Sequence, residues 1–322
     1  MLSMVVAAAC SQGGASPSVG GGTPSPSSAP TEQPPPTEHT ATIVASISLE
    51  GHPAATQIAF GNGDAWIRFA DGSVARVNLE TKAIVAMIPV GSGEFGSLAV
   101  GQDAVWVTTF DEDKLSRIDP ATNTVVAEIA VGANPEGITV TPGAVWVSNH
   151  RGGSISRIDP ATNAVVARID AGRVGPSGPK FIQNAFGDLW TSIPNSSIVI
   201  RLDPETNAVV ATIDVPAVED LVIGDDFVYA TDALGKIDEI QPASNEVVRR
   251  FSPDVSPWLF GDGAFWAPEG SDLLRLDPGS FAPTEIWHVA GGQGGYESMA
   301  FDGSLLWLLT DDGFLVGVQL TL

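Results

Sequence analysis

The chain has 322 residues, of which 43% are hydrophobic, and 38 acidic residues stand against only 15 basic ones. This length and hydrophobic content are enough to bury a core without help from disulfides. The net charge of −23 would repel nucleic-acid phosphates, so we expect no nucleic-acid partner.

The N-terminus predicts export. An apolar run over residues 2–9 ends in small residues before Cys10, which is the only cysteine. The run resembles the end of a bacterial lipoprotein signal, in which the cysteine becomes the lipid-bearing first residue. We therefore predict a signal remnant over 1–10, a lipid anchor at Cys10, an extracytoplasmic place at the cell envelope, and membrane contact only through that lipid. The alternative is a chance apolar start.

Residues 11–40 are rich in Ser, Pro, Gly and Thr. Such a composition cannot bury enough apolar surface to fold, and we predict a solvated, disordered tether. The globular part is expected to begin at residue 41.

Over residues 41–322 a unit of about 40 residues recurs seven times, a period typical of stacked repeats. Each unit contains an aromatic anchor in an apolar strand and, about ten residues later, an Arg-apolar-Asp-Pro turn or a variant of it. The aromatic anchors are Trp66, Trp106, Trp146, Trp190, Tyr229, Trp266 and Trp307. Apolar and polar residues alternate between the anchors, which indicates half-buried strands.

The second unit predicts four strands, over 97–101, 104–110, 114–119 and 124–131. The pentad from Asp119 to Asn123 reads as a turn, since Pro presets φ, Asp caps nearby amides and Asn tolerates the left-handed region. We interpret these recurring Asp residues as turn formers and not as metal ligands. The recurrent Arg is interpreted as a structural residue.

The ends of the repeat region predict a closed ring. The last unit stops at a third strand over 314–320, and the missing fourth strand matches residues 42–48. An N-terminal strand that pairs into the last blade leaves only short, protected edges. The predicted fold class is all-β, a seven-bladed β-propeller of four-stranded blades, and we expect a monomer.

The text G-x-x-x-V-W-V followed by S-R-I-D-P-A-T-N resembles the YVTN-type seven-bladed propeller repeats, and more loosely the streptogramin lyase propellers. The resemblance covers nearly all of the chain after residue 40. It implies the propeller fold, but propellers serve as enzymes, binding modules and scaffolds alike.

Ligands of propellers gather at the mouth of the central channel. Aligned inner strands place carboxylates near one level there: Glu136, Glu219 with its neighbour Asp220, and Glu297. Converging carboxylates repel one another unless a cation or protons neutralise them, so a Ca²⁺ or Mg²⁺ site is one hypothesis. The alternative is a wide channel in which all of these side chains are solvated.

Loop residues after the aromatic anchors form a second set of candidates on the same face. They are Arg68, Phe69, Asn149, His150, Arg151, Asp232, Glu269 and Asp311, with His52 in a neighbouring loop. Together they predict a site for a protein, a glycan or a small polar or cationic ligand, with His150 and Arg151 the preferred pair.

The favoured interpretation is a non-catalytic binding module, because no residues of this chain form a recognisable catalytic set. One alternative is a metal-dependent C–O lyase. The resemblance to streptogramin lyases would then imply a histidine and a Glu-x-His pair, yet none of the four histidines follows a Glu by two positions, and Glu285 stands three before His288. The other alternative is a structural surface scaffold.

Overall fold

A computed structural model describes residues 34–93, 95–172, 177–289 and 295–320. The chain divides into two units, residues 1–35 and 36–322, and the second unit is the β-propeller. Cys10, the signal-like run and most of the predicted tether lie outside the described residues, so they stay predictions.

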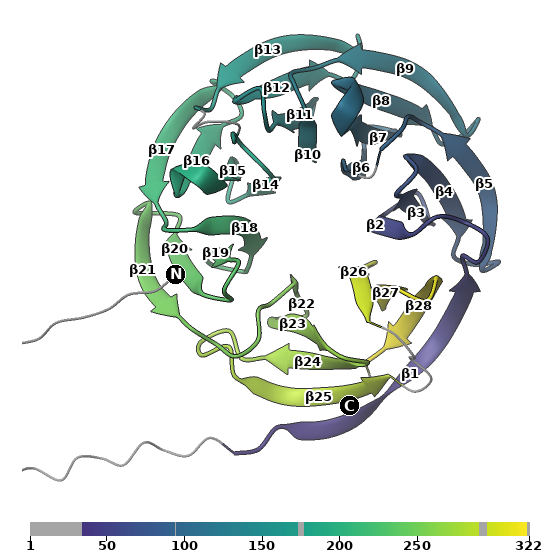
Figure 1. Cartoon of the computed structure of the whole chain (residues 1–322), viewed down its shortest axis with the longest axis vertical. Coiled ribbons are helices and arrows are strands. Elements are labelled where there is room, and N and C mark those ends of the chain that lie inside the picture. The colour runs from purple at the N-terminus through teal and green to yellow at the C-terminus, as the bar shows by residue number, and fades with distance from the viewer. Residues whose placement is uncertain (1–33, 94, 173–176, 290–294, 321–322) are drawn as a thin grey trace, which may run out of the picture. The chain divides into compact units, whose positions relative to one another are not determined.

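Seven blades surround a central channel, and each blade has four antiparallel strands (Figure 1). The innermost strands are β2 (Ala55–Gly61), β6 (Leu98–Gly101), β10 (Pro135–Thr141), β14 (Ile182–Ala185), β18 (Val218–Ile223), β22 (Leu259–Gly261) and β26 (Tyr296–Phe301). The second strands are β3 (Asp64–Phe69), β7 (Ala104–Thr109), β11 (Ala144–Asn149), β15 (Asp188–Ile193), β19 (Val228–Asp232), β23 (Ala264–Glu269) and β27 (Leu306–Thr310).

The outer half of each blade follows in chain order. The third strands are β4 (Ser73–Asn78), β8 (Lys114–Asp119), β12 (Ser154–Asp159), β16 (Ile198–Asp203), β20 (Ile237–Gln241), β24 (Asp272–Leu276) and β28 (Phe314–Gln319). The outermost strands are β5 (Ala83–Pro89), β9 (Thr124–Ala130), β13 (Ala164–Asp170), β17 (Ala208–Asp214), β21 (Glu246–Phe251), β25 (Pro283–Val289) and, for the last blade, β1 (Thr37–Ser48). Two single-turn 3-10 helices, η1 (Phe110–Glu112) and η2 (Pro194–Ser196), follow β7 and β15.

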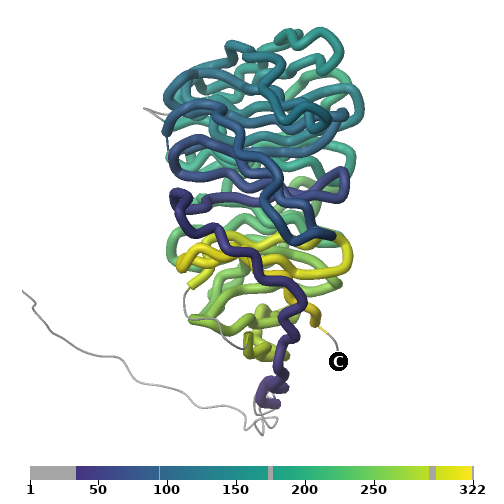
Figure 2. Tube along the Cα trace, turned by 90° about the vertical axis from the view of Figure 1, so that its right-hand side faces the viewer, coloured from purple at the N-terminus to yellow at the C-terminus, as the bar shows by residue number. Residues whose placement is uncertain are grey.

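The predicted fold class is confirmed, including the closure of the ring. Residues Thr42–Ser48 of β1 pair antiparallel with β28, so the first and last strands of the propeller lie side by side (Figure 2). The blade built from the second repeat agrees with the prediction to within one residue at every strand end.

The start of β1 corrects the predicted boundary at residue 41. The strand begins at Thr37, and residues Thr37–Ala41 pair in parallel with β25, the outermost strand of the preceding blade. One strand therefore joins the sixth and seventh blades into a single eight-stranded sheet. The His39 ring stacks on Trp287 with 4.5 Å between centroids, which gives this polar segment a partner that the composition of the tether did not reveal.

The aromatic anchors are buried between blades, as their apolar surroundings in the sequence predict. Trp146 packs into one cluster with Leu189 and Ile200 of the next blade, and Trp190 packs against Leu221 and Val228 of the blade after that. Burial of such large rings between neighbouring sheets is a main source of propeller stability.

The turn prediction is also confirmed. Asp119 Oδ1 accepts a hydrogen bond of 2.8 Å from the amide of Ala121, and Asp159 accepts the equivalent bond from Ala161. Asn123 has a φ of +55°, the left-handed conformation that Asn tolerates. These Asp residues shape turns at the outer rim of the ring and do not face the channel.

Candidate functional site at the mouth of the channel

A cavity of about 400 Å³ opens where loops of the second to fifth blades meet. Its lining combines aromatic and charged side chains. The lining residues are Phe95, Phe110, Glu136, His150, Arg151, Ser177, Lys180, Pro194, Asn195 and Glu219.

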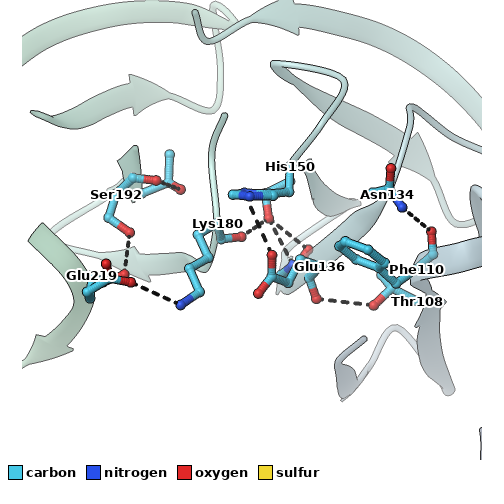
Figure 3. Close-up of polar contacts among 11 residues, drawn as sticks. Thr108, Phe110, Asn134, Glu136, His150, Lys180, Ser192 and Glu219 are labelled. Atoms are coloured by element: carbon cyan, nitrogen blue, oxygen red, sulfur yellow. Dashed lines mark hydrogen bonds and ion pairs between the residues drawn. The ribbon is translucent and has the colours of Figure 1, made fainter. Parts of the chain in front are cut away.

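Glu136 and His150 lie next to each other among the charged residues of the cavity (Figure 3). Glu136 is the second residue of the inner strand β10, and His150 follows directly after β11 of the same blade. Glu136 Oε2 lies 3.7 Å from His150 Nδ1, which is close enough for attraction but too far for a hydrogen bond. Both side chains keep some contact with solvent, with exposures of 15% for Glu136 and 20% for His150. His150 Nδ1 itself is buried and has no hydrogen-bond partner among the residues that the structure describes.

Lys180 brings a positive charge to the same cavity. Its Nζ lies 3.4 Å from Glu219 Oε2, at the start of the inner strand β18 (Figure 3). The backbone fixes this residue on both sides, because its amide donates to the carbonyl of Ser192 at 3.0 Å and its carbonyl accepts a hydrogen bond from the Ser148 hydroxyl. The ammonium group therefore stands near two carboxylates of neighbouring blades.

Burial changes the proton affinity of two carboxyl groups here. It raises the pKa of Glu136 above the ordinary value, against the opposing attraction of His150 and Lys180. Burial also raises the pKa of Asp220 to about 6, although the Leu221 amide donates a hydrogen bond of 2.7 Å to Asp220 Oδ1. Perturbed carboxyl groups in a cleft are typical of functional sites.

The geometry does not fit the proposed Ca²⁺ or Mg²⁺ site. Within the described residues, no group of three or more His, Cys, Asp or Glu side chains could hold one metal ion. Glu297 is exposed on β26 of the seventh blade and does not line the cavity. The positive charge of Lys180 offsets the negative charges of Glu136 and Glu219, the effect that we had expected from a bound metal ion.

Of the predicted ligand-binding residues, the structure brings His150 and Arg151 to the cavity, together with Glu136 and Glu219 of the predicted metal site. The Arg151 guanidinium lies 5.9 Å from the centre of the Phe110 ring. The preferred pair from the sequence thus shares one cavity with two of the aligned carboxylates.

Three other candidates are buried, and for them the structure corrects the expectation. Phe69 is fully buried in the core cluster between the first and last blades. Asn149 is fully buried, accepts a hydrogen bond from the Gly132 amide and donates to the hydroxyls of Ser154 and Ser156. Arg68 is 1% exposed and donates to backbone carbonyls of the next blade. These side chains hold the scaffold.

The remaining candidates lie outside the cavity. Asp232 accepts hydrogen bonds from backbone amides of its own turn, and Asp311 accepts one from the Gly295 amide just before β26. His52 lies beside Phe69 with 5.6 Å between ring centroids. Glu269 is exposed at the end of β23. They lie at or near the ends of strands in different blades, and seven blades spread equivalent positions around the whole ring.

The sequence analysis missed Lys180 and Phe95. Lys180 lies in the connection between β13 and β14, which is longer than the four-residue connection between β9 and β10. An insertion in one copy of a regular repeat is a signal that could have pointed to it. Phe95 gave a weaker signal, a bulky residue in a Gly-rich loop.

No helix in the described part of the chain is long and apolar enough to cross a membrane.

No protein-family profile matches the chain, and a search of curated proteins finds no relative. Many solved structures do match. Among them are virginiamycin B lyase from Staphylococcus aureus in its selenomethionine form (TM-score 0.71) and a catalytically inactive variant of that lyase with quinupristin (TM-score 0.70). Both are 19% identical to this chain, and each match covers 86% of this chain and 98% of the other.

A structure described as a streptogramin B lyase matches at 15% identity with a TM-score of 0.70, covering 86% of this chain and 97% of the other. The resemblance to YVTN-type repeats stays a prediction, since no profile supports it. At these identities the likeness shows the fold alone: this chain has the same β-propeller architecture as the streptogramin B lyases.

Proposed function

We propose that the propeller is a binding module that takes a small zwitterionic molecule in the channel-mouth cavity. The observation that carries the proposal is the Glu136–His150 pair. His150 Nδ1 is buried without a hydrogen-bond partner among the described residues, and its acidic neighbour stands just beyond hydrogen-bond distance. An unsatisfied buried polar atom costs free energy, and a ligand that hydrogen-bonds to it recovers that cost.

The charges of the cavity favour a ligand that carries both signs. Glu136 and Glu219 offer two carboxylates, and Lys180 and Arg151 offer two cations. An ammonium group of the ligand would donate to Glu136 and to His150 Nδ1 beside it, and a carboxylate would meet Lys180 or Arg151. Such contacts are strong in a half-buried cavity because water screens them less than at an open surface.

The site of action that we propose is the cell envelope, with the propeller held by a lipid on Cys10 through the Ser/Pro/Gly-rich segment. This part of the proposal rests on the sequence. Membrane fractionation of the full chain and of a Cys10→Ser variant tests it, because loss of the lipid should move the protein from the membrane to the soluble fraction. Equal distribution of the two proteins would contradict the anchor.

Calorimetric titration tests the binding function with three probes: the dipeptide phenylalanylglycine, its N-acetyl derivative and its C-terminal amide. We expect saturable heat with the zwitterion and at least tenfold weaker binding of each derivative, since each lacks one charge-assisted hydrogen bond. Glu136→Gln should weaken the zwitterion to a similar extent, whereas Glu246→Gln, an exposed carboxylate on β21, should not. Equal affinity of the three probes would contradict a zwitterion site.

A second candidate function is C–O bond cleavage by elimination, favoured by the shared fold and by a buried carboxyl with a raised pKa beside a histidine. Here Glu136 would remove a proton from the carbon next to a carbonyl group and His150 would protonate the leaving oxygen. Glu285 and His288 cannot serve, because they lie on the outermost strand β25, where Glu285 pairs with Arg275 and Trp287 and His288 pairs with Asp272.

Incubation with virginiamycin B or quinupristin in the presence of Mg²⁺, followed by mass spectrometry, separates these candidates. Elimination opens the ring without changing the mass, and hydrolysis adds one water. Ring opening by the wild type but not by Glu136→Gln would establish that the protein is an enzyme. An unchanged substrate would favour the non-catalytic binding module. A purely structural scaffold would show neither turnover nor saturable heat.

A further inference from the structure

We propose that the ligand of the channel-mouth cavity carries a planar aromatic ring, and that Phe95 is the residue that selects it. The inference rests on the proposed binding function and adds the apolar half of the ligand. Phe95 and Phe110 line the same cavity as the charged residues, with 5.7 Å between their ring centroids and an angle of 55°.

Phe95 is exposed where the equivalent residues of other blades are buried or half-buried. It stands eleven residues before the aromatic anchor of its blade. Of the residues at the same spacing in the six other blades, Val255 is half-buried and five are buried: Ala55, Pro135, Pro179, Val218 and Tyr296. Phe95, by contrast, is 59% exposed. The second blade therefore presents a large ring to the cavity at a position that elsewhere serves the core.

A buried arginine holds the backbone of Phe95 in place. Arg68 Nη2 donates to the carbonyls of Phe95 at 2.8 Å and of Gly93 at 2.9 Å, across the boundary between the first two blades. Burying a guanidinium is costly unless it is fully bonded, so its use to fix a surface loop needs a reason. We assign Arg68 as a positioning residue for Phe95.

The rest of the loop is fixed as well. Glu112 Oε1 accepts hydrogen bonds from the amide and the hydroxyl of Ser92, at 2.7 and 2.8 Å. Gly96 has a φ of +136°, and a Cβ there would lie 2.3 Å from the carbonyl of Thr108. Described residues before and after Phe95 are thus held by hydrogen bonds and close packing, which fixes the position of the Phe95 backbone before any ligand arrives.

An aromatic ring is the ligand group that suits this surface. Two tilted phenylalanine rings offer faces and edges, and ring pairs in such geometries are more stable than their buried area alone explains. The Arg151 guanidinium near the Phe110 ring extends the surface by a cation–π contact. The resulting ligand class is an aromatic zwitterion, such as an aromatic amino acid or the end of a small peptide.

Three dipeptides test the inference by calorimetry: phenylalanylglycine, cyclohexylalanylglycine of similar size without a π system, and alanylglycine. The wild type should bind the aromatic probe about threefold to tenfold more tightly than the cyclohexyl probe. Phe95→Leu should bring this ratio to about one, Phe95→Trp should keep it, and Phe186→Leu, at an exposed phenylalanine between β14 and β15, should leave it unchanged.

Arg68→Lys keeps a buried charge but lacks the geometry that reaches both carbonyls. It should lose the aromatic preference while its affinity for alanylglycine stays that of the wild type, a split that general destabilisation would not produce. Equal binding of the aromatic and cyclohexyl probes to the wild type, or an unchanged ratio in Phe95→Leu, would overturn the aromatic selection and leave the zwitterion site standing. Failure of all three dipeptides to bind would remove the proposed function itself.

Discussion

Arg117 of the second blade reaches across to Asn163 in the turn of the third, where its Nη1 donates to Asn163 Oδ1 at 2.9 Å and to the carbonyl of Pro160 at 2.7 Å. The same guanidinium lies 5.2 Å from the centre of the Trp106 ring in its own blade. Arg76, Arg157 and Arg201 repeat the bond to the Asn of the next turn. The two recurrent motifs of the sequence are therefore the two halves of one contact between blades.

We expect Arg117→Met to lower the free energy of unfolding by about 1–3 kcal/mol, because it removes two charge-assisted hydrogen bonds and a cation–π contact. Urea denaturation of the single variants and of the Arg117→Met, Asn163→Gly double variant measures the coupling, since glycine keeps the left-handed turn. Arg250→Met, which removes one ion pair of a 61% exposed guanidinium to Asp238, should cost less, under about 1 kcal/mol. Strict additivity of the two substitutions would show that the Arg117–Asn163 hydrogen bond contributes nothing to the free energy of unfolding.

The junction of β1 and β25 predicts a graded loss of stability. Trp287 is 2% exposed and donates from its ring nitrogen to Glu285 at 2.8 Å, so Trp287→Ala should cost about 3–5 kcal/mol. His39→Ala removes only the stacked ring above it and should cost about 1 kcal/mol. Thermal unfolding measures both. A stability loss for His39→Ala as large as that for Trp287→Ala would contradict this ranking of the two rings.

Asp220 should make the propeller less stable as the pH rises. Because burial raises the pKa of Asp220 to about 6, the folded state binds more protons than the unfolded state between about pH 4 and 6, and stability falls as the pH rises through that window. Asp220→Asn keeps the acceptor for the Leu221 amide and removes the charge. We expect it to be more stable than the wild type by about 1–2 kcal/mol at pH 7 and nearly equal at pH 4. Parallel pH curves would contradict this.

Lys180 should decide whether the cavity responds to metal ions. Lys180→Met leaves Glu136 and Glu219 without the ammonium group between them, so excess Ca²⁺ should raise the melting temperature of this variant more than that of the wild type. Lys114→Met, which breaks ion pairs with Glu112 and Glu128, is the matched control and should show no added response. Strong, saturable stabilisation of the wild type by Ca²⁺ would restore the metal hypothesis.

The sequence by itself determined the architecture. In each repeat, the alternation of apolar and polar residues predicts the strands, and Pro and Asn predict the turns. The Trp and Arg anchors indicate the contacts between blades. All of these are local features that recur with a fixed period. The missing strand after residue 320 and its match at residues 42–48 then determine the closure. The sequence also indicated the centre of the site, since alignment of the inner strands singled out Glu136 and the loops after the aromatic anchors singled out His150.

Only the tertiary structure decided which of the candidate residues come together at the cavity. Arg68 and Asn149 lie at the ends of second strands and His150 follows one directly, yet the first two are buried and His150 lines the cavity, because the depth of a side chain depends on the loop that covers it. Lys180 comes from an insertion whose path no periodicity predicts. Phe95 lines the cavity from a loop whose backbone accepts a hydrogen bond from Arg68 of another blade. Contacts between blades depend on twist and on loop conformation, and these are properties of the closed ring and not of the single repeat.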